Sequence, residues 1–214
     1  MSSKGNLIVI SAPSGSGKSS LASGLFREIE GLVFSVSHTT RQPRKGEKNG
    51  EDYFFVDQDR FREMADEGAF LEWAHVYGNY YGTSRSFVEQ MLASGNDVLL
   101  DIDVQGALKV KGQKPEALMV FVLPPSYREL ENRLMRRGLD DPEVIRRRLQ
   151  IANDEITYYK EYHYVIINKD LEKSIRELRE IVLAARDSAG CDAGGNWEEA
   201  ESVVRTFPGA RPEE

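Results

Sequence analysis

Several features are scarce or missing in this sequence of 214 residues, and each gap excludes a class of protein. Cys191 is the only cysteine, so no intramolecular disulfide can form. No run of about 18 apolar residues occurs, and residues 1–6 are polar, so neither a membrane span nor a secretory signal is visible. We therefore expect a cytoplasmic protein that does not need a membrane.

Histidine and net positive charge are also in short supply. The three histidines, His38, His75 and His163, have no metal-ligand spacing, so we interpret them as structural residues. The formal net charge is −7, which argues against binding a long nucleic acid polymer through a broad basic face. Any phosphate-binding site must therefore be local. A chain of this length suits one domain with insertions or two small lobes.

The most informative stretch is LIVISAPSGSGKSS at residues 7–20. Its first four residues read as a strand buried on both faces, and Leu21, Leu25 and Ile29 follow at helical spacing. The turn between strand and helix then places backbone amides at a helix N-terminus, where the helix dipole favours an anion. The alternative, a serine–glycine linker, would not be expected between a buried strand and an amphipathic helix.

Lys18 and Ser19 supply the side chains that this turn needs to hold a polyphosphate. Lys18 would reach the β- and γ-phosphates, and the hydroxyl of Ser19 would ligate Mg2+. The usual pattern is G-x-x-x-x-G-K-[ST], and Ala12 replaces its first glycine. Alanine is excluded there only if the position needs a positive φ. The predicted phosphate-binding loop comprises Ala12, Pro13, Ser14, Gly15, Ser16, Gly17, Lys18, Ser19 and Ser20.

A second phosphate site is predicted in SHTTRQPRKGEKNGEDY at residues 37–53. Arg41 and Arg44 can donate bidentate hydrogen bonds to a phosphate. Ser37 before them and Tyr53 after them add hydroxyl groups. The composition of this stretch also fits a solvated linker.

The next segment indicates a site for a flat ring. Residues 70–76 read as a strand, and GNYYGTS follows soon after. The paired Tyr80 and Tyr81 either pack as a small core or line a pocket. A carboxylate such as Glu72 is usually solvated. One that faces a pocket could accept two hydrogen bonds from the adjacent N–H groups of guanine, which adenine does not offer.

A third polar cluster follows the buried strand in VLLDIDVQG, at residues 98–106. Ligands of α/β proteins bind at the carboxyl edge of such strands, so Asp101 and Asp103 are candidates for Mg2+ or substrate. One of the two could instead cap the helix that is predicted from Gln105.

Arginines are concentrated between residues 133 and 148, around the end of one predicted helix and within the next. They are Arg133, Arg136, Arg137, Arg146, Arg147 and Arg148. A solvated helix surface with ion pairs is one explanation. Together with the loop at Lys18, a mobile lid that closes over polyphosphate explains the cluster better.

After a last strand and a long amphipathic helix, the apolar periodicity ends. Residues 188–214 are rich in glycine and carry six acids against two arginines, so we expect a mostly disordered tail. In the alternative interpretation, Trp197, Val203 and Val204 belong to a short docking helix.

These stretches together resemble the guanylate kinase family over residues 7–186. The resemblance rests on blocks in the right order: SAPSGSGKSS, SVSHTTRQPRKGEKNGEDYFF, FLEWAHVYGNYYGTS, VLLDIDVQG, LPPS, RLMRRG with RRRL, and VIIN. It implies an α/β fold with a P-loop parallel sheet core flanked by helices, an inserted GMP-binding lobe and a helical lid. The implied core comprises residues 1–37 and 86–187, with the lid at about 134–148, and the lobe comprises residues 38–85.

The resemblance also implies roles for individual residues. The phosphate of GMP would be held by Arg41, Arg44, Tyr53 and Tyr81, and guanine would be recognised by Ser37, Glu72, Thr83 and Asp103. The phosphates of ATP would be held by the loop amides and Lys18, with Mg2+ near Ser19 and Asp101 and the adenine near Asn168. The catalytic cations would be Lys18, Arg41, Arg133, Arg137 and Arg148.

The implied reaction is ATP + GMP ⇌ ADP + GDP by direct in-line transfer. No general base is needed, because the attacking phosphate oxygen is already ionised at neutral pH. Alignment and charge stabilisation must supply the catalysis. One rival is an interaction module of similar fold that binds peptides, in which Lys18 and the lid arginines would have no role. Glu72 and the GNYYGT block argue against a second rival, a related kinase for sugar phosphates. The sequence leaves the oligomeric state open.

Overall fold

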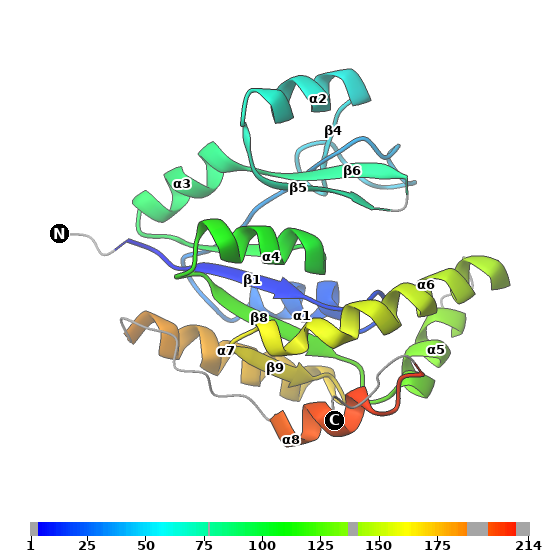
Figure 1. The fold of residues 1–214 in the computed structure, drawn as a ribbon. Helices are drawn as coiled ribbons and strands as arrows, with labels where there is room; N and C mark the ends of the chain where they lie inside the picture. Colours follow the sequence, from blue (N-terminus) through cyan, green and yellow to red (C-terminus); the bar gives the residue numbers. More distant parts are fainter. Residues whose placement is uncertain (1–3, 77, 137–140, 188–196, 209–214) are drawn as a thin grey trace.

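The central layer of the protein is a parallel β-sheet. The computed structural model describes residues 4–76, 78–136, 141–187 and 197–208. In it, five strands form a sheet in the order β2-β7-β1-β8-β9 (Figure 1). The strands are β1 (Leu7–Ser11), β2 (Leu32–Phe34), β7 (Asp97–Asp101), β8 (Leu118–Leu123) and β9 (Tyr164–Ile167). Neighbouring strands are all parallel, and Ile10 of the central strand pairs with Asp101 on one side and with Val120 on the other.

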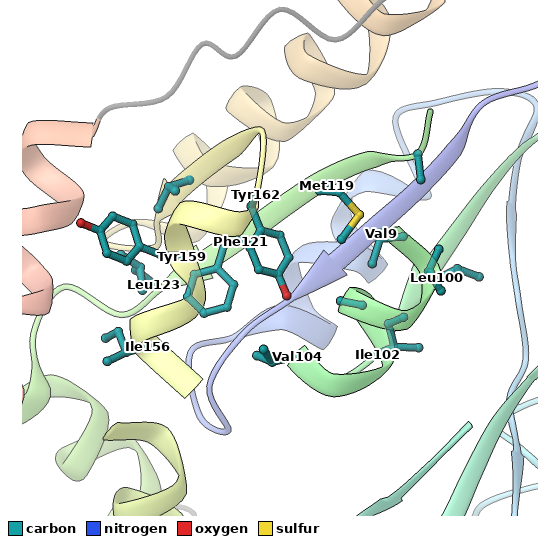
Figure 2. Packing of buried hydrophobic residues seen from close by; sticks show 14 of the residues in the cluster. Val9, Leu100, Ile102, Val104, Met119, Phe121, Leu123, Ile156, Tyr159 and Tyr162 are labelled. Atoms are coloured by element: carbon teal, nitrogen blue, oxygen red, sulfur yellow. The ribbon is translucent and has the colours of Figure 1, made fainter. Parts of the chain in front are cut away.

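Helices cover both faces of this sheet, which explains why its strands are continuous apolar runs. The covering elements are α1 (Lys18–Leu25), α3 (Arg85–Ala93), α4 (Val104–Gln113), α5 (Tyr127–Arg136), α6 (Pro142–Glu155), the 3-10 helix η1 (Ile156–Glu161) and α7 (Leu171–Asp187). Leu25 of α1 and Ile175 of α7 pack on one face. Val110 of α4 packs on the other face, where the rings of Phe121 and Tyr162 lie 4.8 Å apart (Figure 2).

A second sheet is inserted between β2 and α3, with the strand order β4-β3-β6-β5. Its strands are β3 (His38–Thr39), β4 (Phe54–Phe55), β5 (Phe70–Val76) and β6 (Asn79–Ser84), and helix α2 (Gln58–Asp66) packs on it. Asp57 caps the N-terminus of α2, since its carboxylate accepts a hydrogen bond from the Arg60 N–H. Phe61 of α2 stacks on Phe70 and Tyr80, at ring-centroid distances of 4.6 and 5.4 Å. The inserted sheet therefore has a small aromatic core of its own.

This arrangement is the α/β class that the sequence predicts. The parallel sheet forms the core, and the inserted sheet lies on the far side of α4, which packs against β5 (Figure 1). None of the helices in the described ranges is long and apolar enough to cross a membrane.

The C-terminal segment corrects one expectation from the sequence. The expected mostly disordered tail contains helix α8 (Trp197–Val204), and the side chains of Ala200 and Phe207 are 0 % and 2 % exposed. Apolar side chains at the buried positions of this short helix share one face, and packing of that face against the core offsets its weak periodicity. The docking-helix alternative is therefore right, because Trp197, Val203 and Val204 all lie in α8 and the two valines are buried. Residues 188–196 and 209–214 lie outside the described residues.

Candidate active site

The glycine-rich turn connects β1 to α1 at the carboxyl edge of the parallel sheet, as predicted. Gly15 and Gly17 have φ angles of 100° and 94°, in the left-handed region that favours glycine. Gly17 is also constrained by packing, because a Cβ there would lie 2.3 Å from Nδ2 of Asn168. The shape of the loop therefore requires glycine at both positions.

The first two residues of α1 face the end of β7. The Nζ of Lys18 lies 2.6 Å from Oδ1 of Asp101, and it donates a hydrogen bond to the carbonyl of Ile102 at 2.7 Å. The hydroxyl of Ser19 donates to Oδ2 of Asp101 at 3.2 Å. The fold thus brings the predicted loop cation and both predicted metal ligands together from distant parts of the sequence.

Ser19 and Asp101 fit a magnesium ion that is bound together with a nucleotide. Mg2+ prefers oxygen ligands, and it usually takes one or two carboxylates along with substrate phosphates and waters. With only these two side-chain oxygen donors, the site suits an ion that the protein and a polyphosphate hold jointly.

Two adjoining cavities lie at this edge of the sheet. The larger, of about 300 Å³, is lined by Ala12, Pro13, Ser14, Gly15, Gly17, Lys18, Ser19, Ser20, Tyr53, Val76, Tyr81, Asp101, Asp103 and Glu155. The smaller, of about 130 Å³, is lined by Ser37, Tyr53, Glu72, Ala74, Val76, Tyr81, Asp101, Ile102 and Asp103. The walls that they share are formed by Tyr53, Val76, Tyr81, Asp101 and Asp103. A group bound in one cavity can therefore meet a group bound in the other.

Glu72 of β5 is the buried acid of the smaller cavity. Glu72 is only 6 % exposed, and its Oε1 accepts a hydrogen bond from the hydroxyl of Thr83 at 2.6 Å. Burial raises the pKa of Glu72 to about 7, against the opposing effect of the hydrogen bond from Thr83. Glu72 is therefore the pocket-facing carboxylate and not the solvated one. Thr83 is itself buried, and its hydroxyl group holds Glu72 in place.

The structure also resolves two alternatives that the sequence left open. Asp103 is the residue that caps α4, because its carboxylate accepts a hydrogen bond from the Gly106 N–H at 2.7 Å. It nevertheless lines both cavities. The two tyrosines divide the roles between them: Tyr80 stacks on Phe61 in the aromatic core, while Tyr81 lines both cavities.

Arg41 is held by Glu47, a partner that the sequence analysis missed. Two guanidinium nitrogens of Arg41 lie 2.9 Å from the two carboxylate oxygens of Glu47, and the guanidinium carbon lies 5.2 Å from the ring centroid of Tyr53. The hydrogen bonds of this pair raise the pKa of Arg41 and lower the pKa of Glu47. The side chain of Arg44 is exposed, while its N–H donates to the same carboxylate at 2.7 Å. The available signal was a single acid in the basic run RQPRKGEK.

Arg133 and Asn168 support the phosphate-binding loop. The Nδ2 of Asn168 donates to the carbonyl of Ser16 at 2.8 Å. Arg133 donates to the same carbonyl at 3.3 Å and to the carbonyl of Asn168 at 2.9 Å. Arg133 thus binds backbone carbonyls here. Arg148 lies half-buried on α6 and is not among the residues that line the two cavities. Arg137 lies outside the described residues.

Glu155 is a second residue that the sequence analysis missed. It is the last residue of α6, it lines the larger cavity, and its carboxylate accepts a hydrogen bond from the Ser14 backbone. Burial raises the pKa of Glu155 to about 7, against the opposing effect of Lys18. An acid at the polar end of an amphipathic helix carries no signal of its own, so only the packing of α6 onto the loop reveals it.

Fold and site together define the class of P-loop nucleoside monophosphate kinases. The central strand of a parallel sheet leads into a loop with a lysine at its helix end, and this loop faces a second cavity that contains a buried carboxylate. A family model for guanylate kinase matches residues 4–185 of the chain. The chain belongs to the guanylate kinase family.

Individual relatives agree with this assignment. A guanylate kinase from Shewanella sp. (strain MR-7) is 51% identical over 187 residues, covering 87% of this chain and 90% of the relative. A guanylate kinase from Escherichia coli (strain K12) is also 51% identical, over 185 residues and 86% of this chain and 89% of the relative. The crystal structure of guanylate kinase from Anaplasma phagocytophilum superposes with a TM-score of 0.73 at 36% identity, covering 87% of this chain and 89% of that chain.

Proposed function

We propose that this chain transfers the γ-phosphoryl group of ATP to GMP, giving ADP and GDP, by direct in-line transfer. Membership of the guanylate kinase family supports the activity. The observation that carries the assignment of sites is the shared wall of the two cavities, which Tyr53, Tyr81, Asp101 and Asp103 help to form. Donor and acceptor phosphates bound in adjoining cavities can approach each other without a carrier on the protein.

The larger cavity binds ATP in this proposal. The amides of the loop and Lys18 hold the β- and γ-phosphates. When ATP binds, the Nζ of Lys18 leaves its ion pair with Asp101 and binds phosphate oxygens instead. Ser19 and Asp101 would hold Mg2+, which supplies charge neutralisation on the phosphates when it is bound. The family resemblance implies that the adenine binds near Asn168, and Asn168 is tied to the loop by its hydrogen bond to the carbonyl of Ser16.

The smaller cavity binds GMP. Glu72 accepts hydrogen bonds from N1–H and the exocyclic amine of guanine, with Thr83 fixing the carboxylate and with Ser37 and Asp103 as further polar contacts. The phosphate of GMP points toward Tyr53 and Tyr81, which line both cavities. Its remaining partners are Arg41 and Arg44, and Arg41 lies over the ring of Tyr53.

The chemical step needs positioning and charge stabilisation more than proton transfer. The attacking oxygen of GMP is ionised at neutral pH, so no side chain has to remove a proton from it. Lys18 and the arginines of the second sheet and the lid, Arg41, Arg133, Arg137 and Arg148, stabilise the charge that develops on the transferred group. Closure of a lid at about residues 134–148 excludes the water that would otherwise hydrolyse ATP. We further propose that the enzyme works in the cytoplasm on small nucleotides alone.

A coupled assay of ADP release with GMP, AMP, CMP and UMP as acceptors tests the function. GMP should be preferred strongly, because AMP leaves the buried carboxylate of Glu72 without its N–H donors. Equal rates with AMP and GMP would contradict the assignment of the smaller cavity. ADP release that does not depend on any of these acceptors would contradict phosphoryl transfer between the two cavities.

A further inference from the structure

The C-terminal helix is the part of this chain that the family resemblance does not cover. The match to the guanylate kinase family ends at residue 185, and α8 begins at Trp197. Yet α8 and the turn after it are packed into the core, since Val203 of α8 is 5 % exposed and Phe207 of the turn is 2 % exposed. Its apolar side chains join the same cluster as Leu130 of α5. A segment outside the family match is thus part of the folded core.

The turn that follows α8 contacts the start of α5, the helix that carries Arg133. The hydroxyl of Thr206 accepts a hydrogen bond from the Tyr127 N–H at 2.9 Å and donates to the carbonyl of Val203 at 2.7 Å. Tyr127 is the first residue of α5, so its N–H is one of the donors that a helix cannot satisfy internally. The rings of Tyr127 and Phe207 also meet edge to face, at a centroid distance of 5.4 Å.

Helix α8 itself contacts the segment that follows α6, the second arginine-bearing helix. Trp197 packs against Tyr159 at a ring-centroid distance of 6.1 Å. Tyr159 lies in η1, which continues directly from α6. Figure 2 shows Tyr159 at the edge of the core cluster, pointing toward the ribbon of α8. Residues 197–208 therefore contact both the start of α5 and the 3-10 helix that follows α6.

A third contact reaches the loop network. Glu199 pairs with Lys169, the residue after Asn168. Asn168 and Arg133 both bind the carbonyl of Ser16 in the phosphate-binding loop. This contact of α8 thus lies one residue along the chain from a group that supports the loop. Helix α8 lies beside the edge strand β9, away from the inserted sheet (Figure 1).

We propose that residues 197–208 are a brace for the ATP side of the active site, with Thr206 and Phe207 as positioning residues. They hold the first turn of α5 in place, and through it Arg133 and the loop carbonyl at Ser16. This inference rests on the proposed function, because it assigns the larger cavity to ATP. The brace should therefore affect the handling of ATP and leave the handling of GMP unchanged.

Substitutions at Thr206 test the brace. Thr206→Val keeps the shape of the side chain but cannot accept the hydrogen bond from Tyr127, and it should raise the KM for ATP about threefold to tenfold. The KM for GMP should stay within about twofold. Thr206→Ser keeps the hydroxyl group and should restore the KM for ATP. Arg205→Ala is the matched control, because Arg205 directly follows α8 and pairs at 3.2 Å with Glu201 of that helix, and among the described residues it has no contact with the groups that support the loop.

All values are measured well below the melting temperature of each variant, which calorimetry supplies. If Thr206→Val does not fold, Phe207→Leu provides the same test, since it removes the ring contact with Tyr127 while the core remains filled. A lowered melting temperature with the KM values for ATP and GMP unchanged would overturn the proposal. An equal rise in the KM values for ATP and GMP would also overturn it. Failure of the wild type to phosphorylate GMP would instead refute the proposed function, so the two results are distinguishable.

Discussion

Glu72 is the residue on which base selectivity depends in our proposal. It is buried, it is held by Thr83, and it lines the smaller cavity. Glu72→Gln keeps the shape of the side chain but places a donor opposite the donors of guanine. We expect kcat/KM for GMP to fall by about tenfold to a thousandfold and kcat/KM for AMP to fall much less.

Steady-state kinetics with both nucleotides checks this expectation. Asp59→Asn is a suitable control, because the carboxylate of Asp59 is 91% exposed and lies on α2 beside the same sheet. If the ratio of kcat/KM for GMP to kcat/KM for AMP were the same in the Glu72 variant as in the wild type, guanine would be recognised elsewhere. Ser37, Thr83 and Asp103 would be the remaining candidates.

The raised pKa of Glu72 also predicts how the stability depends on pH. The pKa is about 7 in the folded protein, against an ordinary value of 4.5, because burial disfavours the charged form. The folded state therefore binds a proton more strongly than the unfolded state, and ionising Glu72 lowers stability as pH rises from about 4.5 through about 7. Relative to wild type, Glu72→Gln should gain stability over this window and level off above it.

Urea unfolding of both proteins between pH 5 and 8 measures the effect. Glu155 also has a raised pKa, but it is present in both proteins, so its contribution cancels in the difference. A difference in the free energy of unfolding that does not change with pH would show that Glu72 is not a buried carboxylate in solution.

At the scale of single elements, α8 reverses an expectation from the sequence. Loss of a disordered tail would leave the melting temperature unchanged. Because α8 and the turn after it bury Ala200, Val203 and Phe207 in the main core, a chain that ends at Asp187 should instead melt about 10 °C lower or more. A chain that ends at residue 208 is the control and should melt as the full chain does. Calorimetry that finds all three alike would show that α8 contributes nothing to stability.

At the scale of the whole molecule, the two cavities separate the binding of GMP from the transfer of phosphate. Lys18 lines only the larger cavity. Lys18→Ala should therefore fold and bind GMP as the wild type does, while turnover falls by at least about a hundredfold, because the γ-phosphate loses its nearest cation. Calorimetric titration with GMP and the coupled assay measure the two properties. Turnover near the wild-type level in a folded variant would refute the role of the loop.

Local signals in the sequence determined most of the fold and much of the site. The apolar run before the loop, its glycines and Lys18 specify strand, turn and helix through short-range geometry, so the structure has them where they were predicted. The positions of Asp101 and Asp103 at the end of β7 were also predicted correctly. The carboxyl ends of parallel strands all lie at the same edge of the sheet, so the sequence is sufficient to place them there.

Tertiary structure alone decided the rest, because the deciding partners are far apart in the sequence or equivalent within it. Tyr80 and Tyr81 are adjacent and chemically identical. Only the orientation of β6 in the folded sheet determines that Tyr80 packs in the aromatic core and that Tyr81 lines the cavities. Glu155 reaches the loop only because α6 packs beside it. Helix α8 has eight residues, too few to be stable alone, so its existence depends on the core that covers its apolar face.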